Sequence, residues 1–273
     1  MATTSNNQIE TITKDLSIQI NLSGLSFCVL NTETNVIEHL EHITFSTLKN
    51  TETVLDAVKH VFNTHTQLHQ NFTNVTLIHQ NIWQTLVPKA LFKEALLADY
   101  LKYNTKILKT DFIAYDELLA HNIMSVYIPF TNVNNYVFEH FGSFIYKHQS
   151  TVLIESLERD TKNNIESKVY VNFNNKSIDL IIFKAGKLEL YNSFEIFTPE
   201  DVIYYILFTL EQLQLSPDTI NVAVMGLITT DNTNYQILYK YIRHVEIYKP
   251  NYSFTFKATP IYLQHYYSIL NSI

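Results

Sequence analysis

The chain has 273 residues, of which 46% are hydrophobic and 16% are charged, a composition typical of a globular protein rather than a disordered tail. A formal charge of −7 with only two arginines argues against a protein that tracks nucleic-acid phosphates, which needs a basic surface. The longest apolar stretch, residues 202–210, is far shorter than the roughly 20 residues of a membrane-spanning helix, so we expect no membrane span.

The first half predicts a short antiparallel meander followed by alternating helices and strands. Apolar runs at 16–22 and 25–30 flank Ser23-Gly24, a two-residue turn signal, and a third strand is expected at 36–45. Asn50 or Thr51 can cap the helix that follows, because apolar residues then recur at helical spacing. The elements expected next are a strand at 75–78, a helix opened by Pro88, a strand at 124–130, a helix at 131–141, an extended segment at 144–147 and a helix at 150–159.

The second half predicts the same order of elements. Strands at 169–173 and 177–183 flank Asn174-Asn175-Lys176, whose asparagines tolerate positive φ. Thr198 is a hydroxyl cap followed by Pro199 and two acidic residues, a strong signal for a helix start. The remaining elements expected are a strand at 188–196, a helix to about 215, a strand at 220–225, a helix at 232–243, an extended segment at 245–248 and a final helix opened at Thr259-Pro260.

Equivalent landmarks in the two halves are separated by a nearly constant interval of about 150 residues. Ser23 corresponds to Asn174, and Thr51 corresponds to Thr198. Since the residues themselves differ, the repeat is one of pattern rather than of sequence. Antiparallel strands followed by alternating helices and strands predict an α/β fold with a mixed sheet in each half. We therefore expect two lobes around a cleft, residues 1–148 and 149–273, with a boundary loop at 161–167.

The cysteine content and the N-terminal residues bear on the cellular compartment. Cys28 is the only cysteine, lies in an apolar run and is expected to be a buried side chain, so no internal disulfide can form. A lone cysteine is suited to a reducing compartment. Residues 1–10 are polar and lack the apolar core of a secretory signal. These features together favour a cytoplasmic location.

The duplicated pattern resembles the actin-like ATPase superfamily, with its ribonuclease H-like halves, whose members include actin, sugar kinases and the bacterial proteins FtsA and PilM. More closely, the chain looks like a member of an uncharacterised bacterial family with that fold, a domain of unknown function. Residues 17–30 and 168–205 carry this resemblance best, in particular the runs 183–187, 191–194 and 200–205. The resemblance extends over nearly everything after residue 14.

In active members of the superfamily, as the resemblance implies, an Asp-x-Gly-Thr type loop in each first hairpin wraps the phosphates. Here Gln19 stands where the first aspartate belongs, and Asn21 stands where glycine belongs, before Ser23. In the second loop Asn172 replaces the aspartate. The glycines of that loop are replaced by three residues with side chains, Asn174, Asn175 and Lys176.

Two further residues complete this degenerate cleft as the resemblance places it. Asp179 matches an acidic residue that follows the second loop in the family pattern and is not the catalytic one there. Active relatives have a pair of glycines on the adenosine side, of which only Gly226 is present here. An amide cannot replace a carboxylate in holding a divalent metal or orienting an attacking water. We therefore expect no catalytic residues, no resident cofactor and no metal, while weak nucleotide binding stays open.

A possible metal pair and the many tyrosines are the other candidate features. His65 and His69 have the i, i+4 spacing of a metal pair, but Thr66 stands where a zinc hydrolase would have glutamate, which favours a solvated helix end. The 18 tyrosines include several late in the chain that are hard to bury together, so some are expected at a protein-binding surface.

Two functions from different classes follow from these observations. The first, which the loop residues favour, is a non-catalytic scaffold or adaptor that binds another protein. The second is a residual nucleotide-binding ATPase or kinase whose metal-binding acids come from elsewhere, for example Asp179 or Asp231. The absence of an acidic residue from the first hairpin separates the two.

Overall fold

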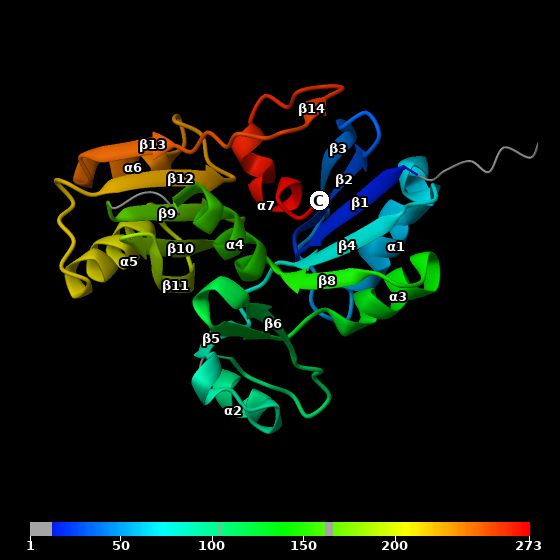
Figure 1. Ribbon diagram of the computed structural model, residues 1–273, viewed down its shortest axis with the longest axis horizontal. Coiled ribbons are helices and arrows are strands. Elements are labelled where there is room, and N and C mark those ends of the chain that lie inside the picture. Colours follow the sequence, from blue (N-terminus) through cyan, green and yellow to red (C-terminus); the bar gives the residue numbers. More distant parts are fainter. Residues whose placement is uncertain (1–12, 104, 162–165) are drawn as a thin grey trace, which may run out of the picture.

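The structure, a computed structural model, describes residues 13–103, 105–161 and 166–273. Two large mixed sheets lie side by side, and a smaller three-stranded sheet projects below them (Figure 1). The antiparallel meanders of the two halves belong to separate sheets. The predicted duplicated architecture is confirmed.

The first sheet contains six strands in the order β14-β3-β2-β1-β4-β8. Strands β1, β2 and β3 pair antiparallel, whereas β4 and β8 extend the sheet in parallel from β1. The bounds of these strands are β1 Lys14–Ile20, β2 Gly24–Asn31, β3 Val36–Thr44, β4 Asn74–His79, β8 Ile145–His148 and β14 Thr255–Phe256.

The second sheet has the order β11-β10-β9-β12-β13, which repeats the order β3-β2-β1-β4-β8 of the first. Its first three strands are again an antiparallel meander, and β12 and β13 again extend it in parallel. The bounds are β9 Lys168–Phe173, β10 Ser177–Lys184, β11 Lys187–Glu195, β12 Asn221–Gly226 and β13 His244–Ile247. The predicted repeat of pattern therefore corresponds to a repeat of topology.

Helices cover both faces of each sheet. On the outer faces, α1 (Val54–Thr64) and α3 (Thr131–Phe141) pack on the first sheet, and α5 (Pro199–Gln212) and α6 (Thr233–Tyr241) pack on the second. On the inner faces, α4 (Gln149–Thr161) and α7 (Tyr267–Leu270) lie between the two sheets (Figure 1). The two sheets are thus joined through a shared apolar layer.

Period-two alternation decides which strand residues enter which layer. In β2, Phe27 and Val29 face the outer helices, whereas Cys28 and Leu30 face α7. Cys28 is fully buried, and burial raises the pKa of its thiol, so the thiol stays protonated. The expectation of a buried apolar cysteine is confirmed.

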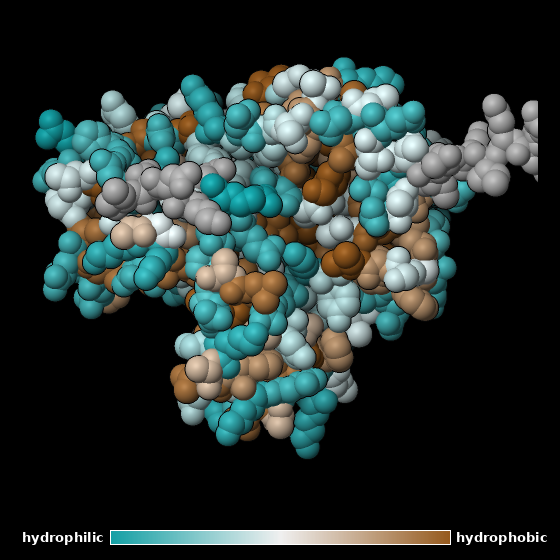
Figure 2. All heavy atoms as spheres, in the orientation of Figure 1, coloured by the Kyte–Doolittle hydropathy of each residue, from teal (hydrophilic) through white to brown (hydrophobic). Residues whose placement is uncertain are grey.

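The region between β4 and α3 differs from the prediction. The expected helix after Pro88 is replaced by β5 (Gln84–Pro88), two 3-10 turns at Lys89–Leu91 and Glu94–Leu96, and the short helix α2 (Leu97–Leu101). Strands β5, β6 (Ala114–Leu118) and β7 (Ile123–Tyr127) form the small sheet. These elements, the insertion, have no counterpart in the second half and project as a separate lobe (Figures 1 and 2).

The end of the chain also differs from the prediction. No long helix follows Pro260; a 3-10 turn at Leu263–Tyr266 and α7 take its place. Before them β14 pairs in parallel with β3, so the C-terminal segment returns to the first sheet. The predicted division after residue 148 stays a prediction, and part of the expected boundary loop, residues 162–165, lies outside the described residues. No helix in the part that the structure describes is long and apolar enough to cross a membrane.

Candidate functional site

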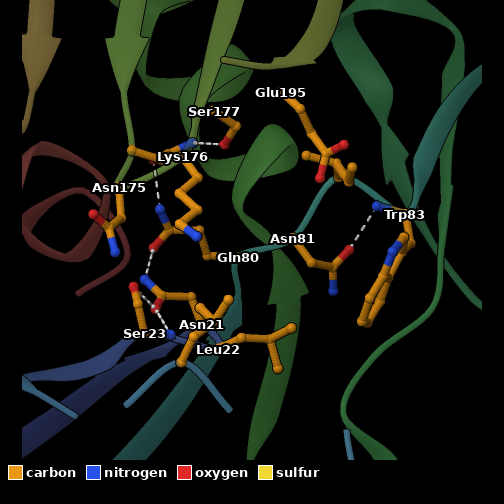
Figure 3. Close-up of a pocket in the computed structure, with 13 residues that line it drawn as sticks. Asn21, Leu22, Ser23, Gln80, Asn81, Trp83, Asn175, Lys176, Ser177 and Glu195 are labelled. Carbon is orange, nitrogen blue, oxygen red and sulfur yellow. Dashed lines mark hydrogen bonds between the residues drawn. The ribbon is translucent and has the colours of Figure 1, made fainter. Parts of the chain in front are cut away.

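The two hairpin turns and the end of β4 meet between the large sheets and line a pocket of about 180 Å³ (Figure 3). The first turn contributes Asn21 to Ser23, the segment after β4 contributes Gln80 to Trp83, and the second turn contributes Asn174 to Ser177. Leu48 and Glu195 complete the wall. In an open α/β sheet, ligands bind where the carboxyl ends of parallel strands diverge, and this pocket has that position.

Asn21 uses its side-chain oxygen to hold the first turn. That oxygen accepts hydrogen bonds from the Ser23 backbone N–H and from the Ser23 hydroxyl, both at 2.7 Å. The Asn21 backbone N–H bonds to the carbonyl of Gly24 at 3.1 Å. A Cβ at Gly24 would lie 2.7 Å from the Ile43 carbonyl, so only glycine fits there. The turn is therefore closed by its own side chains.

Gln80 links the first turn to the second. Its side-chain oxygen accepts from Gln19 Nε2 at 2.6 Å and from Asn21 Nδ2 at 2.9 Å. Its amide nitrogen donates to Asn174 Oδ1 across the cleft. Gln149, at the start of α4, donates from Nε2 to Ser268 of α7 at 3.1 Å and lies 3.5 Å from Asn174 Oδ1. We call the chain of side-chain amides formed by Gln19, Asn21, Gln80 and Asn174 the amide ladder.

Asp179 anchors the second end of the ladder. One carboxylate oxygen accepts from Asn172 Nδ2 at 3.0 Å and from Asn174 Nδ2 at 2.9 Å. The other accepts from the Tyr191 hydroxyl at 3.0 Å and the Ser193 hydroxyl at 2.6 Å. Burial and the neighbouring carboxylate raise the pKa of Tyr191 well above its usual value, so its phenol remains a donor. The carboxylate is thus surrounded by protein donors.

Gly226 ends β12 directly behind the second turn. Its φ is +79°, and a Cβ there would lie 2.2 Å from the Phe173 carbonyl and 2.7 Å from Asn172 Oδ1. Glycine is therefore required by the close approach of β12 to β9, whatever the cleft binds.

Both glutamines at the cleft follow a buried histidine. His79 and His148 are register partners on β4 and β8, so Gln80 and Gln149 emerge side by side. His79 Nε2 lies 2.8 Å from Asn134 Oδ1, and His148 Nε2 lies 3.0 Å from the Asn81 carbonyl. Burial lowers the pKa of His79 to about 4 and that of His148 to about 3. Both rings are neutral near pH 7 and fix the strand ends that present the glutamines.

The structure brings all the residues proposed from the loops to one place. Gln19, Asn21, Asn172, Asn174 and Asp179 share one hydrogen-bond network, with Ser23 bonded to Asn21. Asn175 and Lys176 line the pocket, and Gly226 lies behind it. Whether these residues contact a ligand stays a prediction.

Sequence reasoning missed Gln80 and Gln149, which join the loops. A glutamine after an apolar strand is common, and no motif marks either one. The position of Gln80 directly after a parallel strand was the available signal, since such strand ends converge on clefts.

The two histidines with the spacing of a metal pair, His65 and His69, contact backbone carbonyls. The His65 Nδ1 atom lies 2.8 Å from the Val61 carbonyl, and His69 Nε2 lies 2.7 Å from the Phe62 carbonyl. Across residues 13–103, 105–161 and 166–273, no group of three His, Cys, Asp or Glu side chains is placed to hold a metal ion. The two rings therefore serve to end α1 and the turn that follows it.

Comparison with protein families decides the affiliation of the chain. Residues 3–245 match a family described as "Protein of unknown function (DUF3822)". The chain belongs to the DUF3822 family. No curated protein matches this DUF3822 chain.

Solved structures establish the fold of the DUF3822 chain. A Bacteroides thetaiotaomicron protein with actin-like ATPase fold and unknown function aligns with a TM-score of 0.78 at 23% identity, covering 94% of this chain and 96% of that one. A PilM-PilN type IV pilus biogenesis complex aligns at 0.61 and 12% identity, covering 94% and 97%. The ethanolamine utilization protein EutJ from Carboxydothermus hydrogenoformans aligns at 0.51 and 8%, covering 95% and 88%. The fold is the actin-like ATPase fold.

Proposed function

We propose that this DUF3822 chain is a non-catalytic adaptor that uses the two-lobed actin-like fold to bind another protein. The observation that carries the proposal is the amide ladder, in which Gln80 joins the first turn to Asn174 of the second turn. In this superfamily the two turns wrap phosphates, as the resemblance implies. Here Gln80 links a side chain of one turn to a side chain of the other across the cleft.

The chemistry of the cleft supports the loss of catalysis. The positions of the two loop aspartates hold Gln19 and Asn172, which are neutral. The carboxylate bonded to the second turn, Asp179, accepts four hydrogen bonds and offers no free oxygen to a divalent ion without losing them. The pocket volume of about 180 Å³ is also below the roughly 300–1,000 Å³ of ordinary ligand sites.

Protein binding is supported by the surface and by a fold relative. Among the described residues, large apolar side chains are exposed on α5 and on the insertion, for example Tyr204 at 62% and Tyr103 at 84%. Such exposure on a folded chain is typical of interaction surfaces. The structural relative PilM occurs in a complex with PilN.

Residual nucleotide binding is the second candidate, and one observation favours it. Lys176 lines the pocket, and no ion pair engages its ammonium in the described part of the chain. A free ammonium at the second turn could meet a phosphate. The other acid considered for a metal, Asp231, is fully exposed, and its pKa is lowered by a hydrogen bond from Thr229.

Calorimetric titration with ATP and Mg²⁺ separates the two functions. The adaptor predicts neither binding heat nor ATP turnover, and it predicts that crosslinking in native-host extract captures the same partner with and without ATP. Turnover, or capture that requires ATP, would contradict the adaptor. Binding that Lys176→Ala removes and Lys184→Ala retains would establish the second candidate.

A further inference from the structure

Charge is distributed very unevenly over two exposed segments. Residues 89–109 of the insertion contain five lysines and two carboxylates, a formal charge of +3 in a chain whose total is −7. Residues 195–218, which include α5, contain five carboxylates and no basic residue. Opposite potentials of this kind steer association and fix its register.

The basic segment also exposes apolar side chains. Leu91, Tyr103 and Leu108 are 68%, 84% and 54% exposed. Beside them, Lys93, Lys106 and Lys109 are exposed and, within the described residues, make no ion pair. Figure 2 shows brown apolar and teal polar residues mixed over this projecting lobe. We call these six residues the basic surface.

The face of α5 is complementary. Tyr204 and Phe208, one helical turn apart, stack with ring centroids 6.0 Å apart and are 62% and 50% exposed. Phe197 precedes the helix and is 82% exposed. Along the helix, Glu200 and Glu211 are exposed acids. We call these five residues the acidic surface. The opposite side of α5 is buried on the second sheet through Val202, Ile206 and Leu210.

The two surfaces are carried by α5 and by the insertion, which lie on either side of one indentation in the molecular outline (Figure 2). Leu86 and Pro88 of the insertion face Leu188 and Leu190 of β11 across a cavity of about 320 Å³. α5 lies directly behind β11, since Phe194 and Tyr205 stack at 4.4 Å. Two copies related by a two-fold axis can each contribute both surfaces to one contact. Such a contact forms a closed dimer.

We propose that a second copy of this chain occupies the indentation, with the basic surface of each copy against the acidic surface of the other. The pairing covers the exposed aromatic side chains on both sides and matches lysines with carboxylates. It shares these exposed aromatic side chains with the adaptor proposal, but it uses neither the cleft nor an external partner, so it is tested separately.

Charge reversal tests the pair. The wild-type chain is measured by light scattering after size exclusion at about 100 µM, where a contact with a micromolar Kd is populated. It should give twice the mass of one chain. Lys106→Glu with Lys109→Glu, or Glu200→Lys with Glu211→Lys, should each give the mass of one chain. An equimolar mixture of the two variants should recover the double mass, because each variant supplies the charge that the other has reversed.

The control is Lys59→Glu with Lys257→Glu, which changes the net charge by the same amount and sign as Lys106→Glu with Lys109→Glu. These two lysines lie on α1 and after β14, away from both surfaces, so the control should retain the double mass. Circular dichroism checks that each variant is folded, and recovery by mixing shows it independently. A wild-type mass of one chain, a mass that grows beyond two chains with concentration, or charge variants that stay paired would overturn the proposal.

Discussion

At the scale of residues, the amide ladder consists of uncharged amides that bond to one another and to one carboxylate, Asp179. Asn21, Gln80 and Asn174 each use both a side-chain oxygen and a side-chain nitrogen. An amide supplies donor and acceptor together, so such groups can satisfy each other without water or ligand. A buried network of this kind is costly to break, since every lost partner leaves another group unsatisfied.

Asp179→Ala should lower the free energy of unfolding by about 3 kcal/mol, because four donors lose their acceptor in a buried site. Urea denaturation measures the change, and Asp218→Ala, at an exposed carboxylate, serves as the control. Asp179→Asn should fall between wild type and Asp179→Ala, since one oxygen remains. A loss below about 1 kcal/mol for Asp179→Ala would show that the donors find other partners.

The buried His79 predicts a dependence of stability on pH. Its folded pKa of about 4 lies below the unfolded value near 6.5. Between these values the unfolded chain binds more protons, so stability is full above pH 6.5 and falls as the pH drops towards 4. The His79 contribution to this loss should be about 3 kcal/mol.

Chemical denaturation at several pH values measures this slope. His79→Gln should flatten it, whereas His244→Gln, at an exposed histidine, should leave it unchanged. His148 adds a loss of the same sign, and the half-buried Asp116, whose pKa burial raises, opposes it. Because both remain in His79→Gln, the difference in slope reports His79 together with its charge effect on His148. Equal slopes in wild type and His79→Gln would contradict the assignment.

At the scale of elements, local signals are strongest where the chain enters α5. The Thr198 hydroxyl accepts from the Asp201 backbone N–H at 3.3 Å, and the Asp201 carboxylate accepts from the Thr198 and Phe197 N–H groups at 2.9 Å. These two backbone donors lower the pKa of Asp201. Thr198 and Asp201 thus form a capping box, and Pro199 occupies the first helical position.

Thr198→Ala should cost about 1 kcal/mol in the free energy of unfolding, because the Asp201 backbone N–H in the first turn of α5 loses its side-chain acceptor. Thr219→Ala, at an exposed threonine outside any cap, should change it little. Guanidinium denaturation of both variants provides the comparison. If the two variants lose the same amount, the cap contributes nothing to the native state.

At the scale of the whole molecule, the two sheets are coupled by α4 and α7 in the apolar layer and by the amide ladder at the cleft. Gln80→Ala removes the link between the turns and leaves the apolar layer intact. Amide hydrogen exchange should then accelerate at both turns, including the Asn21 and Asn174 N–H groups. Gln84→Ala is the control, since Gln84 is also buried but bonds to Ser125 within the insertion. Faster exchange at the first turn alone would mean that the ladder does not couple the lobes.

Restoring the loops should reopen a nucleotide site if the cleft descends from one. The change is Gln19→Asp, Asn21→Gly and Asn172→Asp, with glycine at positions 174 to 176. Asn172 Nδ2 lies 3.0 Å from the Asp179 carboxylate, so Asn172→Asp places a second negative charge beside that of Asp179. The variant should therefore be less stable without Mg²⁺, and ATP with Mg²⁺ should raise its Tm. A variant with the glycines alone should show no such gain. Nucleotide affinity in wild type that the redesign does not improve would place the site elsewhere.

The sequence alone determined the elements whose signals are local. The hairpin at Ser23-Gly24, the helix at residues 131–141 and the start of α5 follow from turn chemistry, apolar period and capping, which act over a few residues. The repeat at an interval of about 150 residues indicated the duplicated fold. The residues of both loops could be proposed from their order in the chain, because each lies in a hairpin that this fold places at the cleft.

Only the tertiary structure decided what depends on contacts between distant residues. The segment after Pro88 has helical apolar spacing, but it forms two 3-10 turns and the short α2, which pack on the small sheet where β5 pairs with β7, about 40 residues on. The C-terminal segment returns to β3 in the same way. Gln80 and Asn174 are 94 residues apart, and no local pattern links them. Hydrogen-bond partners across a cleft are set by how two sheets pack, which is why the sequence identified the loops and only the fold revealed the ladder.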